Sequence, residues 1–556
     1  MGYGLIRLHG FSMYPDEFGY WASAANTVGY DWSQVASLGS YYSFGYSLVL
    51  TPILWIFKGG VLAYRVAIVV NVLLQCVSLI LLKGLFTIIY PKMHKLDAIY
   101  CIGIAVFYPV WSFFVQITLT EALLSFLFIL IVFLMARFFE KPSFLRALAW
   151  FVPVFYLIAV HMRTVGVVGV AFLTFMLWAW SNPRTRKYIL IAIISLIVVG
   201  IGFFTVKGII QSTVYANVDE NVLAINDFSS ILSRVSAVLN IDGILNLIQG
   251  MIGKIWYLGL SSFGLFYIAM GYLFKQTVLL FKRLKKNRKV KTKQYVCFFI
   301  LFSMIAQILI TSVYMLDPYK LDNICYGRYN EYILPVIMAL GIRQIMRCEH
   351  PFRYGLLVIL ASIPMCAIVI RYSLSVGTTN IHEYFVAGIS YLWDARNFDI
   401  VNDYIKSLLM GSALSMFVIM AITFSGKRGH YTQLLNAVIA IEIALAIILS
   451  SESTYLSGDV DRVDSRVSRV IAEDENVNSR IYYLNENKDR CFVDLIQFNL
   501  KDRTVNVSYP DQIMERVNVG DYVILDNDST FDRNMKKTYR LEEETYWFKL
   551  YKKLRD

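Results

Sequence analysis

About twelve long apolar runs occupy most of this 556-residue chain, and they constrain its fold more than any other feature. They recur between residues 45 and 450, and each is close to the length that an α-helix needs to cross a bilayer. Hydrophobic residues make up 57% of the chain and charged residues only 17%, whereas soluble proteins carry more charge. Because backbone polar groups in lipid must be bonded within their own segment, we expect these runs to be helices. The sequence therefore predicts a polytopic α-helical membrane protein.

The predicted organisation has three parts. Residues 1–60 form a first extracytoplasmic loop with interfacial helices, residues 61–450 form the transmembrane domain, and residues 451–556 form a separate domain. The stretch at 45–57 is apolar but short and contains Pro52, so we expect an interfacial or re-entrant element there. We expect membrane-spanning helices at 61–90, 98–117, 119–139, 147–163, 164–181, 188–207, 251–281, 295–317, 333–347, 354–371, 405–424 and 431–450.

Basic residues fall on one side of this predicted membrane. If the first loop faces outside, every loop predicted to face the cytoplasm is basic, as near 91–97, 138–146 and 182–187. The densest basic segment is KRLKKNRKVKTK at 282–293, with eight Lys or Arg residues and no acid. Topology and contact with membrane lipids then account for the net charge of +12, and we expect no nucleic-acid partner. The prediction is a plasma-membrane protein whose first loop and C-terminal domain lie on the outer face.

The start of the chain is unusual for such a topology. Twelve spans would put both ends outside, and no signal-peptide pattern is visible. The segment MGYGLIRLHG at residues 1–10 is too short to cross a bilayer. We therefore expect that a further span precedes residue 1, which would give thirteen spans and a cytoplasmic N-terminus.

After residue 450 the sequence becomes polar, and its patterning changes. The segments RIYYL, CFVDLIQF, RTVNVSY, DYVILD and WFKLY alternate or run like strands, and VDSRVSRVIAEDE and DQIMERV read as short helices. These patterns predict a small C-terminal α/β domain, which the span count places outside the membrane.

Ionisable residues gather in the loops that this topology puts on the outer face. Ionisable groups near membrane depth are costly, so such a gathering indicates function. Acids, a histidine and arginines from separate loops on one face are what a site for an anionic, hydroxyl-rich ligand needs. The residues are Asp16, Glu17, Glu121, His161, Arg163, Asp317, Lys320, Asp322, Arg328, Glu331, His382 and Glu383.

Each of these residues also has a purely structural interpretation. Glu121 can favour a helix N-terminus through the helix dipole, and His161 with Arg163 can be interfacial side chains. Asp16 and Glu17 can form an ordinary solvated turn. Arg328 can pair with the nearby Glu331. The aromatic residues between positions 14 and 46 fit an aromatic belt as well as a sugar-stacking surface.

The chemistry of this gathering favours transfer of a sugar. A carboxylate can accept a proton from an attacking hydroxyl, and arginines stabilise the charge on a departing phosphate. Nucleotides are absent from the outer face, so an activated sugar has to arrive on a lipid carrier. The sequence contains no Walker motif or Gly-rich phosphate loop, which agrees with this. The expected reaction is sugar transfer from a polyprenyl phosphate.

Four stretches give the chain a resemblance to a known family. They are PDEFGYWASAA with the following YYSFGYSLVLTPILWIF, AYRVAIVVNVLL, TLTEALLSFLFIL with AVHMRTVGV, and GRYNEYILPVI. In order and spacing, the chain resembles the GT-C superfamily of lipid-carrier-dependent glycosyltransferases. It is most similar to the branch of the protein O-mannosyltransferases and the lipid A aminoarabinose transferases. The motifs cover residues 12–340, and beyond them only the layout of thirteen spans and a small outer domain matches.

The resemblance implies roles for individual residues. Family members keep a catalytic acid in the first outer loop, which here falls on Asp16 with Glu17 as its neighbour or acceptor contact. Arg163 and Arg328 would lie near the lipid phosphate. Glu121, His161 and Tyr329 complete the expected substrate-binding set.

The resemblance also implies a reaction course. Members are thought to invert the anomeric carbon by direct displacement, so no covalent sugar intermediate is implied. No metal ligands are assigned, because some relatives use a divalent metal and others do not. The chain departs from the family in one respect: the span that should precede Asp16 is absent from this sequence.

Three other interpretations of the sequence remain open. A transporter or lipid flippase would need polar residues at mid-membrane, and few charges are centred within the predicted spans. A polysaccharide polymerase or ligase would share the outer-face arginines. A non-catalytic scaffold that displays the C-terminal domain would leave the clustered charges unexplained. The acceptor is equally open between a glycan, a lipid and a protein, and the patterns do not identify the sugar or the length of the lipid.

Overall fold

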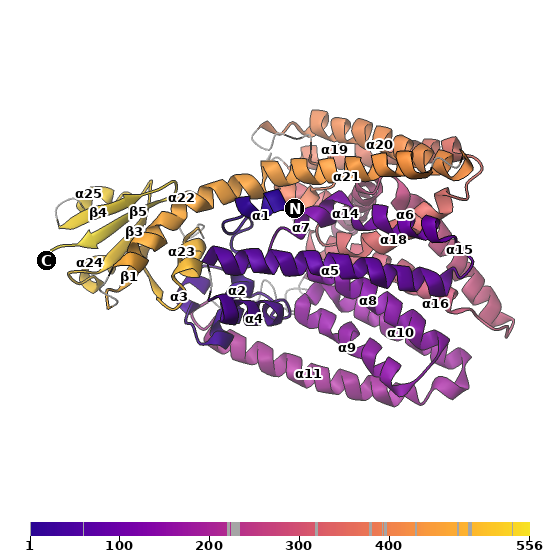
Figure 1. Ribbon diagram of the computed structural model, residues 1–556, viewed down its shortest axis with the longest axis horizontal. Helices are drawn as coiled ribbons and strands as arrows, with labels where there is room; N and C mark the ends of the chain where they lie inside the picture. Colours follow the sequence, from indigo (N-terminus) through magenta and orange to yellow (C-terminus); the bar gives the residue numbers. More distant parts are fainter. Residues whose placement is uncertain are drawn as a thin grey trace.

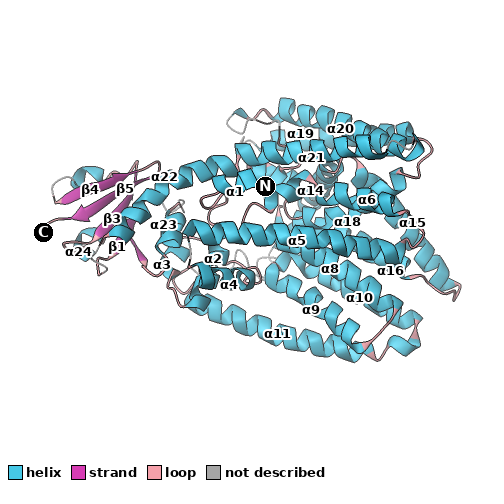
Figure 2. Cartoon of the chain, viewed as in Figure 1, coloured by secondary structure: helices cyan, strands magenta, loops and turns pink. Residues whose placement is uncertain are grey.

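The computed structural model contains an elongated helical body and a small sheet domain at one end of it (Figure 1). Helices account for nearly all of the body, and the strands are confined to the C-terminal domain (Figure 2). The structure describes residues 2–58, 60–218, 223, 234–316, 321–376, 381–391, 393, 397–428, 431–474, 478–486, 492–535 and 538–555.

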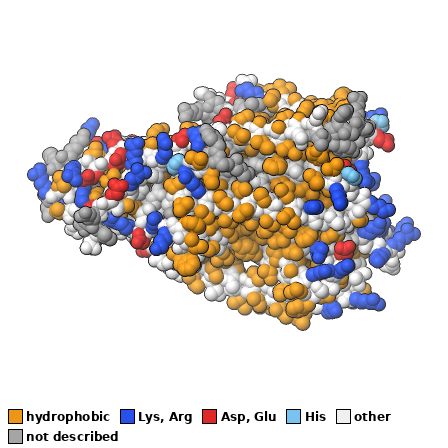
Figure 3. Space-filling model, in the orientation of Figure 1, with side chains coloured by type: hydrophobic (Ala, Val, Ile, Leu, Met, Phe, Trp, Pro, Cys, Tyr) orange, Lys and Arg blue, Asp and Glu red, His pale blue; other side chains and the backbone are white. Residues whose placement is uncertain are grey.

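Several helices of the body are long and apolar enough to cross a membrane. In the described part of the chain there are eight of them, or nine if one bent helix pair is counted as a single span. Hydrophobic side chains cover the middle of the body, and Lys and Arg gather at the end farthest from the sheet domain (Figure 3). The long helices are α5 (Gly60–Ile89), α8 (Thr120–Glu140), α10 (Val165–Ser181), α11 (Tyr188–Thr213), α16 (Thr292–Tyr314), α19 (Pro351–Val376), α20 (Ile400–Arg428) and α21 (Tyr431–Glu452).

Each predicted span corresponds to a helix or a helix pair, but the span predicted at 251–281 is wrong as a single helix. It consists of α14 (Ile241–Ser261) and α15 (Leu265–Lys285), whose axes differ by 111°. Between the two helices Phe263 and Gly264 both lie in the left-handed region, with φ of 55° and 77°, and only glycine adopts that region without strain. The Ser262 hydroxyl then accepts a hydrogen bond from the backbone N–H of Phe266 at 3.1 Å and so caps the start of α15.

Two other predicted spans are broken or short. The run at 98–117 divides into α6 (Lys95–Val106) and α7 (Pro109–Phe114), because Pro109 cannot continue the preceding helix and begins a new one instead. The span predicted at 333–347 is α18 (Leu334–Ile345), a helix of 12 residues that is buried along almost its whole length. It packs among other helices, so burial in protein replaces contact with lipid.

The C-terminal domain is α/β, as predicted. It follows α22 (Thr454–Glu473), and its five-stranded sheet has the order β2-β1-β3-β5-β4. The pairs of β1 with β2 and with β3 are parallel, and β5 is antiparallel to β3 and β4. The strands are β1 (Ile481–Leu484), β2 (Val505–Ser508), β3 (Tyr522–Asp526), β4 (Tyr539–Glu544) and β5 (Phe548–Lys553).

Two details of that domain differ from the sequence prediction. The run CFVDLIQF was predicted as a strand, but its described part lies in helix α23 (Val493–Leu500). Almost every residue of α23 is buried, Asp494 and Gln497 included, and the pattern of a short run that is buried on all sides does not distinguish a helix from a strand. Strand β4 was missed because its residues YRLEEE lie at the sheet edge and are mostly polar.

The first loop is packed between the helical body and the C-terminal domain. It contains α1 (Gly2–Arg7), α2 (Asp16–Val28), α3 (Ser33–Ala36) and α4 (Ser47–Phe57). The Tyr14 hydroxyl donates to Asp461 at 2.7 Å, and Trp32 Nε1 donates to the Lys501 carbonyl at 2.6 Å. Trp21 packs edge-on against Phe498 of α23 with ring centroids 5.0 Å apart. These contacts fix the position of α2, whose first residue is Asp16.

Candidate functional site

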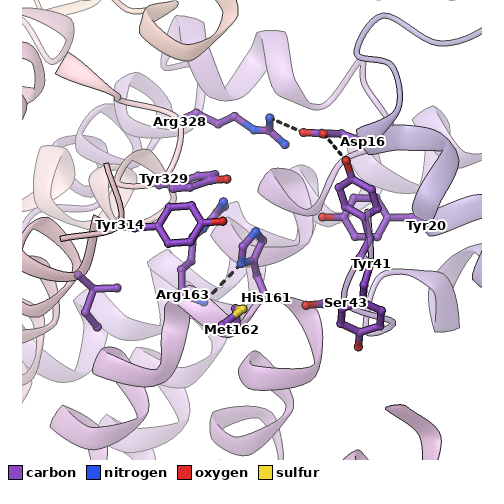
Figure 4. Close-up of a pocket in the computed structure, with 12 residues that line it drawn as sticks. Asp16, Tyr20, Tyr41, Ser43, His161, Met162, Arg163, Tyr314, Arg328 and Tyr329 are labelled. Carbon is purple, nitrogen blue, oxygen red and sulfur yellow. Dashed lines mark hydrogen bonds and ion pairs between the residues drawn. The ribbon is translucent and has the colours of Figure 1, made fainter. Parts of the chain in front are cut away.

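A pocket of about 90 Å³ opens beside the first residue of α2. Asp16 and Arg328 face each other across one part of it, Tyr314 and Tyr329 form one wall, and Tyr20 and Tyr41 lie on the opposite side (Figure 4). The lining comes from five separate regions of the chain and consists of Asp16, Tyr20, Tyr41, Tyr42, Ser43, His161, Met162, Arg163, Ile310, Tyr314, Arg328 and Tyr329.

Two carboxylates and two arginines form one connected ion-pair network at this pocket. Arg328 Nη1 lies 2.8 Å from Asp16 Oδ2, and its Nε lies 2.8 Å from Glu121 Oε1. The same Glu121 oxygen accepts from Arg163 Nη2 at 3.0 Å. Glu121 and both arginine side chains are at most 5% exposed, whereas the Asp16 side chain is 29% exposed. Glu121 is therefore the buried counter-ion of the arginines, and Asp16 is the carboxylate that can reach a ligand.

Arg163 has donors left over after this pairing. Its Nε and Nη1 atoms are buried and have no hydrogen-bond partner. The guanidinium carbon lies 4.0 Å from the centroid of the Tyr329 ring, so one face is stacked on an aromatic side chain. Buried arginine N–H groups are costly unless they are bonded. The arrangement is thus suited to an anion with several acceptor oxygens.

Local structure explains how these four residues reach one place. Asp16 and Glu121 each lie in the first turn of a helix, α2 and α8, where the helix dipole stabilises a negative charge. Arg163 lies in the 3-10 turn η1 (Met162–Thr164), which separates α9 (Phe144–Val160) from α10. Arg328 lies in the loop before η3 (Glu331–Ile333). Asp16, Arg163 and Arg328 thus line the same pocket, whereas Glu121 lies behind the two arginines and does not line it.

His161 contributes a neutral ring to the pocket. Its imidazole lies 5.5 Å from the Tyr329 ring, centroid to centroid, in the turn between α9 and η1. Burial, together with the positive charges of Arg163 and Arg328, holds the pKa of His161 well below its usual value. At neutral pH the ring therefore adds no third positive charge. Its Nδ1 atom accepts a hydrogen bond from the backbone N–H of Arg163 at 3.4 Å, so Nε2 carries the proton and can donate to an oxygen atom of a bound sugar.

Glu17, which was predicted to share catalysis with Asp16, does not line the pocket. Its carboxylate is fully buried and accepts hydrogen bonds from the backbone N–H groups of Ser12 (2.6 Å) and Met13 (2.9 Å). The other oxygen accepts from the Tyr64 hydroxyl (2.8 Å) and from the Thr118 hydroxyl (2.6 Å) and backbone N–H (2.8 Å). Neighbouring residues of a helix project about 100° apart, so Asp16 faces the pocket while Glu17 faces the core. These bonds fasten α2 to α5 and to the segment before α8.

Several tyrosines of the pocket were not singled out from the sequence. Tyr42 donates its hydroxyl to Asp16 Oδ1 at 2.8 Å and thereby holds the carboxylate from the side opposite Arg328. Tyr20, Tyr41 and Tyr314 supply ring surface. The only signal for Tyr20, Tyr41 and Tyr42 was the density of aromatic residues at 14–46, which an aromatic belt explains equally well, and no signal pointed to Tyr314.

Other residues of the predicted outer-face gathering lie apart from this pocket. Glu331 is buried, and its Oε1 accepts from the hydroxyls of Tyr108, at 3.0 Å, and of Tyr257. The alternative pairing of Arg328 with Glu331 is therefore not formed in the described structure. Glu383 lines a separate small cavity. His382 does not line the pocket, and Asp317, Lys320 and the side chain of Asp322 lie outside the described part of the structure.

The carboxylates of the pocket do not form a protein-held metal site. Within the described residues no group of three or more His, Cys, Asp or Glu side chains converges. Both pocket carboxylates already pair with arginine, and hard divalent cations prefer several oxygen ligands. The donor set therefore fits an anionic ligand better than a cation.

The fold of this chain is similar to that of solved membrane proteins. No protein-family model and no curated protein matches the chain. ArnT from Cupriavidus metallidurans bound to undecaprenyl phosphate has a TM-score of 0.55 at 12% identity, covering 99% of this chain and 95% of that one. ArnT in the apo state gives 0.52 at 13% identity with the same coverage. The archaeal oligosaccharyltransferase AglB from Archaeoglobus fulgidus gives 0.45 at 11% identity, covering 94% and 66%. The likeness to ArnT shows a shared fold and agrees with the predicted fold class, a polytopic helical protein with a small C-terminal α/β domain.

Proposed function

We propose that this protein is an integral-membrane glycosyltransferase that moves a sugar from a polyprenyl-phosphate carrier to an acceptor at the outer face of the membrane. The single observation that carries the proposal is the network of Asp16, Arg328, Glu121 and Arg163 at one pocket. It places a carboxylate that can take up a proton next to arginine donors that can bind a phosphate. The undecaprenyl phosphate bound to ArnT, which has the same fold, supports a lipid phosphate as the ligand.

Donor binding is assigned to the arginines. The unpartnered Nε and Nη1 atoms of Arg163 would donate to the phosphate oxygens of the carrier, and Arg328 would lie beside them. Glu121 keeps the two arginines neutralised and oriented before the donor arrives. The phosphate of the lipid-linked sugar thus meets arginine N–H groups that are already oriented. In a site of low dielectric these groups stabilise developing negative charge most strongly.

Acceptor activation is assigned to Asp16. The acceptor hydroxyl attacks the anomeric carbon as the bond from that carbon to the phosphate oxygen breaks, and the hydroxyl proton passes to the Asp16 carboxylate. The polyprenyl phosphate leaves with the bonding electron pair, and its additional negative charge lies against Arg163 and Arg328. Direct displacement of this kind inverts the anomeric carbon and needs no covalent sugar intermediate. No step requires a metal.

Tyrosines would position the sugar between these groups. Tyr20 and Tyr41 face Tyr314 and Tyr329 across the pocket, which provides aromatic surface on both sides of a bound ring (Figure 4). Tyr42 holds the Asp16 carboxylate in place through its hydroxyl. Among the described residues, those that line the pocket belong to the helical body and the first loop, and none belongs to the C-terminal domain.

The proposal is tested by turnover. Purified protein in nanodiscs is incubated with a panel of polyprenyl-phosphate sugars and candidate acceptors, and mass spectrometry follows loss of the sugar from the carrier. We expect one donor to be consumed by the native protein and not by the Asp16→Asn variant. Movement of an intact lipid-linked sugar across proteoliposomes, with no cleavage of the sugar–phosphate bond, would instead establish a transporter.

A further inference from the structure

A second group of cations lies at the opposite end of the helical body from the Asp16 pocket. Helix α16 joins the two places: Lys293 is near its start, and Ile310 and Tyr314 at its end line the pocket. The 21 residues from Lys293 to Tyr314 correspond to about 32 Å of helix, which is close to the thickness of the hydrocarbon core. The two places therefore lie near opposite faces of the membrane.

Cations from two helices stack on the same aromatic side chain there. The Arg343 guanidinium carbon lies 3.7 Å from the centroid of the Tyr90 ring, and Lys293 Nζ lies 4.2 Å from it. Lys293 Nζ also lies 5.3 Å from the Tyr272 ring, and the hydroxyls of Tyr90 and Tyr272 are hydrogen-bonded at 2.9 Å. The four residues come from α18, α16, the end of α5 and α15, so the arrangement is held by four helices.

Within the part of the chain that the structure describes, these cations have no acidic partner. Arg343 is 8% exposed, its Nε atom is buried without a hydrogen-bond partner, and no carboxylate of the described residues forms an ion pair with Arg343 or Lys293. Arg347 lies within electrostatic reach of Lys293 and adds further positive charge. Asp97 interacts electrostatically with Cys101 but forms no ion pair with Arg343 or Lys293. A buried arginine held next to a lysine with no counter-ion is costly, and an anion from outside the chain would remove that cost.

We propose that Arg343 and Lys293, held over Tyr90 and Tyr272, bind the phosphate of an anionic membrane lipid at this end of the protein. The group lies where α5 and α18 end and α16 begins, beside the middle of α15, and the basic segment at 282–291 joins α15 to α16. Basic pockets between helices at this depth bind phosphate headgroups, and the planar guanidinium supplies paired donors to phosphate oxygens. The site is distinct from the proposed donor pocket and does not depend on the proposed reaction.

The test measures lipid retention by native mass spectrometry of the full-length protein. The probes are phosphatidylglycerol, phosphatidylcholine and inorganic phosphate. We expect the native protein to retain phosphatidylglycerol in preference to phosphatidylcholine. The Arg343→Gln and Lys293→Gln substitutions are each expected to weaken that binding about fivefold, the worth of one cation near a lipid phosphate.

A matched control removes the same charge from a neighbouring exposed place. The double variant Arg288→Gln/Lys289→Gln changes two exposed cations of the basic segment and should leave the affinity for phosphatidylglycerol within about twofold. Equal loss in the control and in Arg343→Gln/Lys293→Gln would overturn the site, and so would equal retention of both lipids. Displacement of phosphatidylglycerol by millimolar inorganic phosphate would overturn the lipid as its natural ligand. If Arg343→Gln fails to fold, Lys293→Gln alone decides the question, because Lys293 is only partly buried.

Discussion

Arg328 reaches Asp16 at 2.8 Å across 312 positions of the sequence, and with its Nε atom it holds Glu121 at the same distance. One buried guanidinium thus connects the start of α2, the start of α8 and the loop before η3. One carboxylate oxygen of Asp16 accepts a hydrogen bond from Arg328, and the other accepts one from the Tyr42 hydroxyl. The partly exposed carboxylate is therefore fixed in direction as well as in position.

Replacement of Asp16 by Asn is expected to abolish sugar transfer without unfolding the protein. The amide keeps the shape of the side chain and can still accept from Tyr42, but it cannot take up the acceptor proton. We expect kcat to fall by about 100- to 10,000-fold, the usual contribution of a general base. Transfer is measured by mass spectrometry, with Asp31→Asn on the same loop as the control. Full activity in Asp16→Asn would remove Asp16 from the mechanism.

Replacement of Arg163 is expected to weaken donor binding more than it slows the chemical step. Arg163→Gln loses both unpartnered donors, so we expect the KM for the lipid donor to rise by roughly 10-fold or more. Arg163→Lys keeps the charge but not the planar fork and should recover only part of the affinity. Steady-state kinetics with varied donor concentration separate these effects. An unchanged donor KM in Arg163→Gln would contradict the assignment of the phosphate to this residue.

Much of the site could be predicted from the sequence, because the order of membrane spans determines which distant loops lie at the same face of the membrane. Once the apolar runs were placed, Asp16, Glu121, Arg163 and Arg328 had to lie at the same face, and the structure brings all four into one network. Which of two adjacent acids faces the pocket was not predictable. That choice depends on the rotation of α2, which is set by hydrogen bonds from residues as distant as Thr118.

The helix boundaries show a related limit. Hydropathy identifies the apolar runs, but it carries no information on the backbone dihedral angles that break a run into two helices. The break between α14 and α15 depends on two consecutive left-handed residues, Phe263 and Gly264, within a continuous apolar run. The break before Pro109 depends on a missing N–H. In α23, burial on all sides removes the alternation that separates strands from helices.

Replacement of Glu121 by Gln is expected to destabilise the protein strongly. The substitution leaves Arg163 and Arg328 buried with only the Asp16 charge between them, and breaking such a buried pair costs about 3–5 kcal/mol. Thermal unfolding in nanodiscs measures the loss. Glu140→Gln, at the exposed far end of the same helix, serves as the control. Undecaprenyl phosphate should raise the unfolding temperature of Glu121→Gln more than that of the native protein, because the phosphate supplies the lost negative charge.

Glu17 is expected to act on stability and position rather than on chemistry. Both carboxylate oxygens of Glu17 accept hydrogen bonds from N–H or O–H groups. In Glu17→Gln the side-chain NH2 replaces one of these oxygens, so the N–H or O–H groups on that side lose their acceptor. We expect a loss of about 1–3 kcal/mol in the free energy of unfolding, with little change in the pH profile of kcat. Denaturant unfolding and the pH profile are compared with those of Asp16→Asn. A changed pH profile in Glu17→Gln with unchanged stability would indicate direct participation in catalysis.

The buried carboxyl of Glu331 is expected to make stability depend on pH. Burial raises the pKa of Glu331 to about 8, although the hydroxyls of Tyr108 and Tyr257 favour its ionised form. Between the ordinary glutamate pKa and about pH 8 the folded protein therefore holds a proton that the unfolded chain releases. This contribution to stability is fully present below the ordinary pKa and is lost as the pH rises to about 8, at up to about 1.4 kcal/mol per pH unit. Glu331→Gln should flatten the fall of the unfolding temperature between pH 5 and pH 8, whereas Glu140→Gln, which removes an exposed carboxylate, should keep it. An identical pH dependence in Glu331→Gln and in the native protein would show that Glu331 is already ionised in the fold.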